Sequence, residues 1–213
     1  MKRNKTIKQQ EGQEVVQVSI ERKQKKSRAW TKLIARVAIF GGISAIFYVI
    51  PVPPFNFPIF PGQFGFLNIH IDEVPALIAG FAYGPIAGSL VLIIRTLVKL
   101  PFTSTAFVGE LADLIYSLAF ILPAAFIYKQ NRKFSNAIGA LVIANLVQIG
   151  VATIVNFYLV YDLYNSMFFG GHIPFTKDAF ISIIPPFNLI KNAIVIVITL
   201  LVYKSTKRVV ERI

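Results

Sequence analysis

The stretch "PPFNLIKNAIVIVITLLVYK", residues 185–204, is apolar enough to cross a bilayer, yet Asn188 and Lys191 lie near its beginning. About 20 consecutive apolar residues suffice to span the hydrocarbon core. A charge inside such a span costs about 2.5 kcal/mol or more unless it has a partner, a watery pocket or a route to the headgroups. Asn188, Lys191 and Asn192 share one face of a helix, because side chains three and four residues apart are neighbours. The position of Lys191 therefore indicates one of two arrangements: its side chain faces a ligand pocket, or it snorkels to the membrane surface.

The composition of the whole chain supports a membrane location. Hydrophobic residues make up 55%, charged residues only 15%, and the mean hydropathy is +0.63. These values are typical of an integral membrane protein. The 213 residues fit six spans of roughly 20 residues each, and the absence of cysteine excludes a disulfide framework. We predict an all-α membrane protein with six transmembrane helices.

The hydrophobic runs divide the chain into three regions. Residues 1–32 form a basic, Gln-rich cytosolic tail, residues 33–204 a six-helix membrane domain that binds a substrate, and residues 205–213 a basic cytosolic C-terminal tail. A short second helix begins near Pro75, with Asp72 or Glu73 as its cap. The other predicted spans are residues 33–50, 86–100, 106–128, 137–159 and 186–203.

Two of the connections between these helices are long loops. "PVPPFNFPIFPGQFGF", residues 51–66, contains five prolines and five phenylalanines, which exclude a regular helix. We expect this irregular extracellular loop to fold back onto the helices, either as a lid over a pocket or as a passive plug. A second, polar and aromatic loop is expected over residues 161–184.

The distribution of Lys and Arg predicts the orientation. In an N-in, C-in topology, 18 of the 22 basic residues lie in cytosolic segments, in agreement with the positive-inside rule. The net charge of +12 thus reflects membrane orientation, and we expect no nucleic-acid partner. Lys191 then lies about 8 Å below the outer start of its helix. Together with Arg95 and Lys99 it is expected in the outer half of the membrane, where a pocket for an extracellular ligand would open.

A second polar cluster lies in "PFTSTAFVGELADLIYS", residues 101–117. Thr105 is expected to cap the fourth span, and Glu110 and Asp113 follow at i,i+3 on one helical face. Carboxylates inside a span need partners, which Arg95, Lys99 or Lys191 could supply. They would then form part of a ligand site or a structural ion-pair network.

Two other functions are open for this cluster. Glu110 and Asp113 could be the acid/base pair of an intramembrane enzyme acting on a lipid or isoprenoid. No HExxH or GxSxG sequence accompanies them, so we do not favour an enzyme. A stand-alone proton-coupled carrier is the third alternative.

The fifth span contains three amides. Asn156, near its outer end, is expected in the pocket, whereas Asn145 and Gln148 are expected to bond neighbouring helices. His70 and His172 are isolated beside loops, so neither is favoured as a metal ligand, and we expect no metal or cofactor.

The first span has two faces of small residues. Ala38 and Gly42 are i,i+4, and so are Gly41 and Ala45. Such faces allow another helix to approach closely, either within the same chain or from a partner protein.

Three motifs, in order along the chain, resemble the riboflavin-specific S components of energy-coupling factor (ECF) transporters. They are "DEVPALIAGFAYGPIAGSLV", "TSTAFVGELAD" and "FNLIKN". The resemblance covers residues 38–203. It implies a substrate-binding subunit of the bacterial cell membrane that captures riboflavin or a related flavin, as transported ligand, for import.

The resemblance also implies roles for individual residues. Asn188, Lys191 and Asn156 would hydrogen-bond the flavin, with Glu110 beside the ligand. From the polar clusters described above, we add Asp113, Thr105 and Lys99 to the predicted ligand site. Ala38 and Gly42 would dock the transmembrane T component, which works with two cytosolic ATPases. The chain departs from the family at Asp113, where asparagine is usual, in "HIDE" at residues 70–73, and in a longer loop after the first helix. Riboflavin, a phosphorylated flavin and a related vitamin therefore remain open as ligands.

Overall fold

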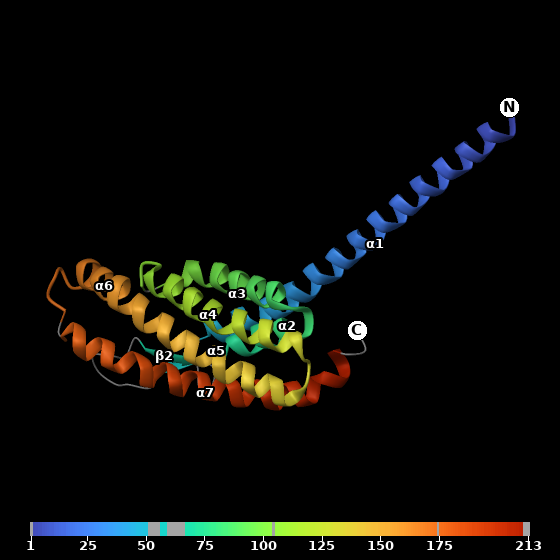
Figure 1. Ribbon diagram of the computed structural model, residues 1–213. Coiled ribbons are helices and arrows are strands. Elements are labelled where there is room, and N and C mark those ends of the chain that lie inside the picture. The colour runs from blue at the N-terminus through green and yellow to red at the C-terminus, as the bar shows by residue number, and fades with distance from the viewer. Residues whose placement is uncertain (1, 51–55, 59–66, 104, 174, 211–213) are drawn as a thin grey trace. The chain divides into compact units, whose positions relative to one another are not determined.

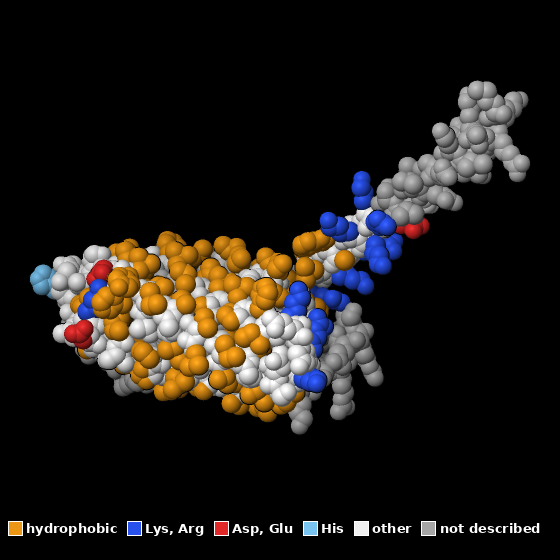
Figure 2. Space-filling model, viewed as in Figure 1, with side chains coloured by type: hydrophobic (Ala, Val, Ile, Leu, Met, Phe, Trp, Pro, Cys, Tyr) orange, Lys and Arg blue, Asp and Glu red, His pale blue; other side chains and the backbone are white. Residues whose placement is uncertain are grey.

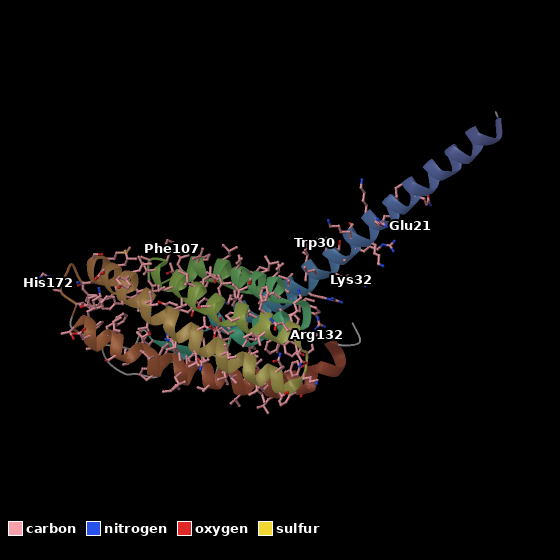
Figure 3. All side chains as sticks on the ribbon, in the orientation of Figure 1. Glu21, Trp30, Lys32, Phe107, Arg132 and His172 are labelled. Atoms are coloured by element: carbon pink, nitrogen blue, oxygen red, sulfur yellow. The ribbon has the colours of Figure 1, made fainter. Side chains whose placement is uncertain are left out.

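The computed structural model describes the backbone of residues 2–50, 56–58, 67–103, 105–173 and 175–210. The chain divides into two compact units, Met1–Arg36 and Val37–Ile213. Helix α1 (Lys2–Val49) contributes to both of them. In the first unit the described side chains are mostly exposed, and Glu21, Trp30 and Lys32 are marked in Figure 3.

The second unit is a helical bundle with a two-stranded hairpin (Figure 1). Strands β1 and β2 pair antiparallel, with Asn56 opposite His70. In chain order, the elements that follow α1 are β1 (Asn56–Pro58), β2 (Asn68–His70), α2 (Glu73–Tyr83), α3 (Pro85–Lys99), the 3₁₀ turn η2 (Leu100–Phe102), α4 (Val108–Gln130), α5 (Phe134–Val155), the π-helical turn η3 (Asn156–Val160), α6 (Tyr161–Phe168) and α7 (Lys177–Val210).

Among the described residues, five helices are long and apolar enough to cross a membrane. They cover Ile20–Val49, Pro85–Phe102, Val108–Gln130, Phe134–Phe168 and Lys177–Tyr203. Helix α2 is apolar but has only 11 residues. At 1.5 Å per residue it is shorter than the hydrocarbon core. The prediction of an all-α membrane protein with six apolar helices is confirmed, with α2 too short to span by itself.

Small residues allow α2, α3 and α4 to pack closely. A Cβ atom added to Gly88 of α3 would lie 2.9 Å from the carbonyl oxygen of Ala76, and one on Gly80 would lie 3.2 Å from Cβ of Ala125. Helix α2 also contacts α7, and α5 packs between α4 and α7 (Figure 1). Helix α2 is thus buried inside the bundle, where its charged first turn meets α3, α4 and α7.

The outer surface of the second unit is largely hydrophobic, as Figure 2 shows for one face. Exposed side chains on α3 and α5 include Ile86, Leu97, Ile143 and Leu146. Such a surface suits contact with lipid chains. Arg132 and His172 lie at opposite ends of the bundle (Figure 3). The N-in, C-in orientation of these ends stays a prediction.

The end of the fifth span and the start of the last differ from expectation. Residues 161–168, predicted as loop, form α6, which continues from α5 through η3. Helix α7 begins at Lys177 instead of Pro186, with Pro185 and Pro186 inside it. Prolines are tolerated in membrane helices where neighbouring groups bond the freed carbonyls. Phe180 and Ile184 are buried in a cluster with Ala112, Ala152 and Val160. This packing stabilises the turns before the prolines.

We predicted an irregular loop over residues 51–66. Residues 56–58 of this segment differ from the prediction, because they form a short strand that pairs with β2. The lid function predicted for residues 51–66 otherwise concerns positions outside the described residues. The predicted region boundaries after residues 32 and 204 fall within α1 and α7, and the division into tails and a substrate-binding domain stays a prediction.

Candidate functional site

A cavity opens among α1, β2, α3, α4, η3, α6 and α7 in the second unit, on the side of the bundle where α2 begins. Its volume is about 920 Å³ when the open mouth is included. All seven residues predicted to bind ligand line it. The lining consists of Tyr48, Leu67, Asn68, His70, Lys99, Thr105, Gly109, Glu110, Ala112, Asp113, Tyr116, Asn156, Val160, Tyr164, Phe180, Ile184, Phe187, Asn188 and Lys191.

Lys191 is buried beside two carboxylates. Only 2% of the residue is exposed, and Nζ lies 3.3 Å from Oε1 of Glu73 and 3.2 Å from Oδ1 of Asp113. It stands 14 residues after the start of α7, about 21 Å along the helix. The predicted depth of 8 Å was therefore wrong, because it assumed a helix starting at the prolines. Paired and buried in this way, Lys191 does not snorkel to the headgroups.

Arg95 is the second cation of the cluster and is fully buried. Its Nη2 donates to Oδ2 of Asp113 at 2.7 Å and to the hydroxyl of Ser117 at 2.7 Å, while Nη1 pairs with Asp72. The guanidinium also lies 4.6 Å from the ring centroid of Tyr48. Asp113 thus bridges Arg95 and Lys191, which joins α3, α4 and α7 through one carboxylate.

Glu73 and Asp72 begin α2, but neither caps it with a side-chain hydrogen bond. Glu73 accepts from Ser117 Oγ at 2.5 Å and from Lys191, and Asp72 pairs with Arg95 and His70. Asp72 thus stands at the N-cap position, as predicted, but its side chain does not cap the helix, because the cations of α3 and α7 bind both carboxylates. Asp72 and Glu73 stand in an otherwise apolar stretch, and charges in such a stretch need partners. This sequence signal could have placed both residues in the cluster.

His70 completes the cluster from strand β2. Burial, reinforced by the charge of Lys191, lowers the pKa of His70 to about 3, so the imidazole is neutral near pH 7. One ligand atom each from His70, Asp72 and Asp113 lies within 4.8 Å of the others, a spacing that a metal ion could use. Arg95 and Lys191 already bind these carboxylates, and two cations at the same oxygens oppose a metal ion. The structure gives no reason to revise the expectation of no metal at His70.

Thr105 and Glu110 meet at the start of α4. The hydroxyl of Thr105 donates to Oε2 of Glu110 and accepts from the backbone N–H of Gly109 at 3.1 Å. Thr105 therefore bonds the first turn, as predicted, although the helix begins three residues later at Val108. Glu110 is turned into the cavity and bound to a hydroxyl, whereas Asp113 one turn on is bound to cations.

The remaining predicted ligand residues offer amides and an ammonium. Asn156 Nδ2 donates to the hydroxyl of Tyr116 and to the carbonyl of Ala152, both at 2.7 Å. It opens the π-helical turn η3, and such turns often occur at functional sites. Lys99 is half-buried at the lining, with Nζ 5.5 Å from the ring centroid of Tyr48.

The two small-residue faces of α1 have different surroundings. Gly41 and Ala45 are buried, and a Cβ on Gly41 would lie 2.8 Å from Cγ2 of Ile94. Ala38 and Gly42 are exposed, and within the described part of the chain no neighbouring atom lies within 4 Å of a Cβ built on Gly42. The first face therefore packs within the fold, and the second remains open to lipid or to another protein.

Comparison with known proteins agrees with this architecture. Residues 32–203 match the family described as "ECF transporter, substrate-specific component". The chain is similar over 84% of its length to a solved structure described as "Structure and mechanism of the S component of a bacterial ECF transporter". The similarity covers 96% of that chain, with a TM-score of 0.71 and 28% sequence identity.

Two characterised relatives carry related names. "Riboflavin transporter RibU" of Staphylococcus aureus (strain TCH60) is 31% identical over 179 residues, which cover 84% of this chain and 93% of the relative. "Riboflavin transporter FmnP" of Bacillus subtilis (strain 168) is 28% identical over 187 residues, 84% of this chain and 95% of the relative.

Proposed function

This chain belongs to the substrate-specific components of ECF transporters, which are multi-pass proteins of bacterial membranes, and on that premise we propose that it captures riboflavin from outside the cell. Two relatives named as riboflavin transporters support this choice of ligand. Membership in a family of transporter components decides against the alternative of an intramembrane enzyme built on Glu110 and Asp113.

One observation carries the proposal: a cavity lined by aliphatic and aromatic side chains together with amide, carboxylate and ammonium groups that converge from four helices. The flavin ring is flat and apolar on its faces, and one edge alternates carbonyl acceptors with a ring N–H donor. Asn156, Asn188 and Lys191 supply both donors and acceptors for such an edge. Glu110 and Thr105, at the start of α4, would accept from hydroxyls of the ribityl chain, since the Thr105 hydroxyl already donates to Glu110.

The direct test is flavin binding by the purified protein. We expect saturable quenching of riboflavin fluorescence at micromolar concentration or below, and a yellow, visibly absorbing flavin that co-purifies with the protein. Thiamine and biotin serve as non-competing controls. Quenching that is absent at micromolar riboflavin, with one of the other vitamins bound instead, would overturn the choice of ligand.

If ATP hydrolysis drives import, other subunits must supply the energy, because this sequence contains no GxxxxGK[ST] phosphate-binding loop. We propose that a transmembrane T component and two cytosolic ATPases supply it, with Ala38 and Gly42 of α1 at the contact with the T component. Purified chain in liposomes should then bind riboflavin without accumulating it. Accumulation driven by a proton gradient without partner subunits would favour the stand-alone carrier.

The contact on α1 can be tested with Gly42→Leu. No neighbouring atom of the described residues lies within 4 Å of the added Cβ, so riboflavin binding should equal that of the wild type. Bulk inserted into a close helix contact costs about 1–3 kcal/mol, so transport with the partner subunits should fall by about tenfold. Gly139→Leu on α5, where the space is equally open, is the matched control and should transport normally. Equal transport by both variants would remove Gly42 from the contact.

A further inference from the structure

A chain of buried amides extends from the cavity into the interface of α5 and α7. Asn188, at the cavity, accepts at Oδ1 from Nε2 of Gln148 at 2.8 Å. Gln148 accepts at Oε1 from Nδ2 of Asn192 at 2.9 Å, and the same Nδ2 donates to Oδ1 of Asn145 at 2.7 Å. Gln148 is fully buried and does not line the cavity, so it would reach a ligand only through Asn188.

The direction of these hydrogen bonds is set at the cavity end. Nδ2 of Asn188 donates to the backbone carbonyl of Ile184 at 2.9 Å, and a carbonyl can only accept. The amide nitrogen of Asn188 must therefore face Ile184, and its oxygen must face Gln148. Gln148 donates its N–H group to that oxygen, so its own oxygen faces Asn192 and accepts from it. Each hydrogen bond therefore fixes which end of the next amide carries the oxygen and which the nitrogen.

We propose that Gln148 is a positioning residue for ligand binding, which holds the Asn188 amide so that its oxygen accepts from a ring N–H and its nitrogen donates to a ring carbonyl. This inference rests on the proposed flavin function. Without Gln148, the oxygen of Asn188 would lose the donor that holds it in place, and the amide would be held by the Ile184 carbonyl alone. The oxygen would then tilt away from the ligand towards another donor.

The surroundings of Gln148 explain why an amide stands there. A buried polar side chain is costly unless its groups are paired, and an apolar residue would serve helix packing alone. Both polar groups of the Gln148 amide have partners: Nε2 donates to Asn188 in the cavity wall, and Oε1 accepts from Asn192. Asn145, one turn earlier on α5, is bonded to Asn192 and lies further along the chain of amides from the cavity.

The test compares riboflavin with 3-methylriboflavin, in which the ring N–H is replaced by N–CH₃. Wild-type protein should prefer riboflavin, and Gln148→Met, which keeps the volume but removes both hydrogen bonds, should raise the Kd for riboflavin by about five- to tenfold. The preference over the methylated flavin should fall by a similar factor, because the lost bond is the one to the ring N–H. Thr153→Val on the same helix removes a hydroxyl bonded only to the carbonyl of Ile149 in its own helix, and it should leave both affinities unchanged.

Two further variants make the result decisive. In an Asn188→Ala background, Gln148→Met should cause no additional loss, since Gln148 acts through Asn188. If Gln148→Met does not fold, Gln148→Asn retains the amide but is one methylene too short to reach Asn188, and the same loss of preference is expected.

A weakened riboflavin affinity with an unchanged preference over 3-methylriboflavin would show a structural role only and overturn the proposal. So would wild-type values for both ligands in Gln148→Met. Failure of the wild-type protein to bind riboflavin is a separate outcome, which defeats the proposed function and this inference with it.

Discussion

Replacing Arg95 with methionine is expected to lower the free energy of unfolding by about 3–5 kcal/mol, the cost of leaving buried charges without their partner. Arg95 is fully buried and binds Asp72, Asp113 and Ser117. Its removal leaves the Asp72 carboxylate, also fully buried, with only a neutral His70 beside it. For a domain of this size the melting temperature in detergent should fall by roughly 6–20 °C.

Arg132→Met is the matched control, because Arg132 is exposed between α4 and α5 (Figure 3). It should change the free energy of unfolding by no more than about 0.5 kcal/mol. Adding Asp72→Asn to Arg95→Met should recover part of the lost stability, since the unpaired charge is then gone. A single Arg95→Met variant as stable as the wild type would show that the cluster does not hold the helices together.

The second large effect is expected on ligand affinity. Lys191→Met should weaken riboflavin binding by about 1.5–3 kcal/mol, the range for a hydrogen bond to a charged group. The corresponding rise in Kd is about 10- to 150-fold, measured by titration of flavin fluorescence on the folded fraction. Lys191 already has Glu73 and Asp113 as partners, and these hold its ammonium at the cavity wall ready for a ligand carbonyl.

Lys177→Met, the same substitution on the same helix, distinguishes loss of this contact from loss of a positive charge. Lys177 pairs with Asp162 at 3.2 Å, and its side chain is 31% exposed. Exposed ion pairs contribute about 1 kcal/mol or less. This control should bind riboflavin as the wild type does. Unchanged affinity in Lys191→Met would restrict Lys191 to a structural part in the charge cluster.

Several features of this protein follow from its sequence alone. The proportion of apolar residues determined that the chain belongs in a membrane, because about 20 consecutive apolar residues are stable there as a helix. Helical periodicity determined that Asn188 and Lys191 share a face, as do Glu110 and Asp113. These are local properties, since positions three and four residues apart are neighbours in any α-helix. The same reasoning failed at Pro186, where a proline taken as a helix start lies inside α7.

Only the tertiary structure decided which groups meet. Lys191 and Glu73 are separated by 118 positions in the chain, and they pair because α2 lies buried against α7. Sequence patterns offered two small-residue faces on α1, and packing against Ile94 buries the one with Gly41 and leaves Gly42 open. Gln148 bonds a neighbouring helix, as predicted, but only the packing of α5 against α7 shows that one of its partners is Asn188 of the cavity wall. Contacts of this kind depend on how distant helices pack, and helical periodicity carries no information about that.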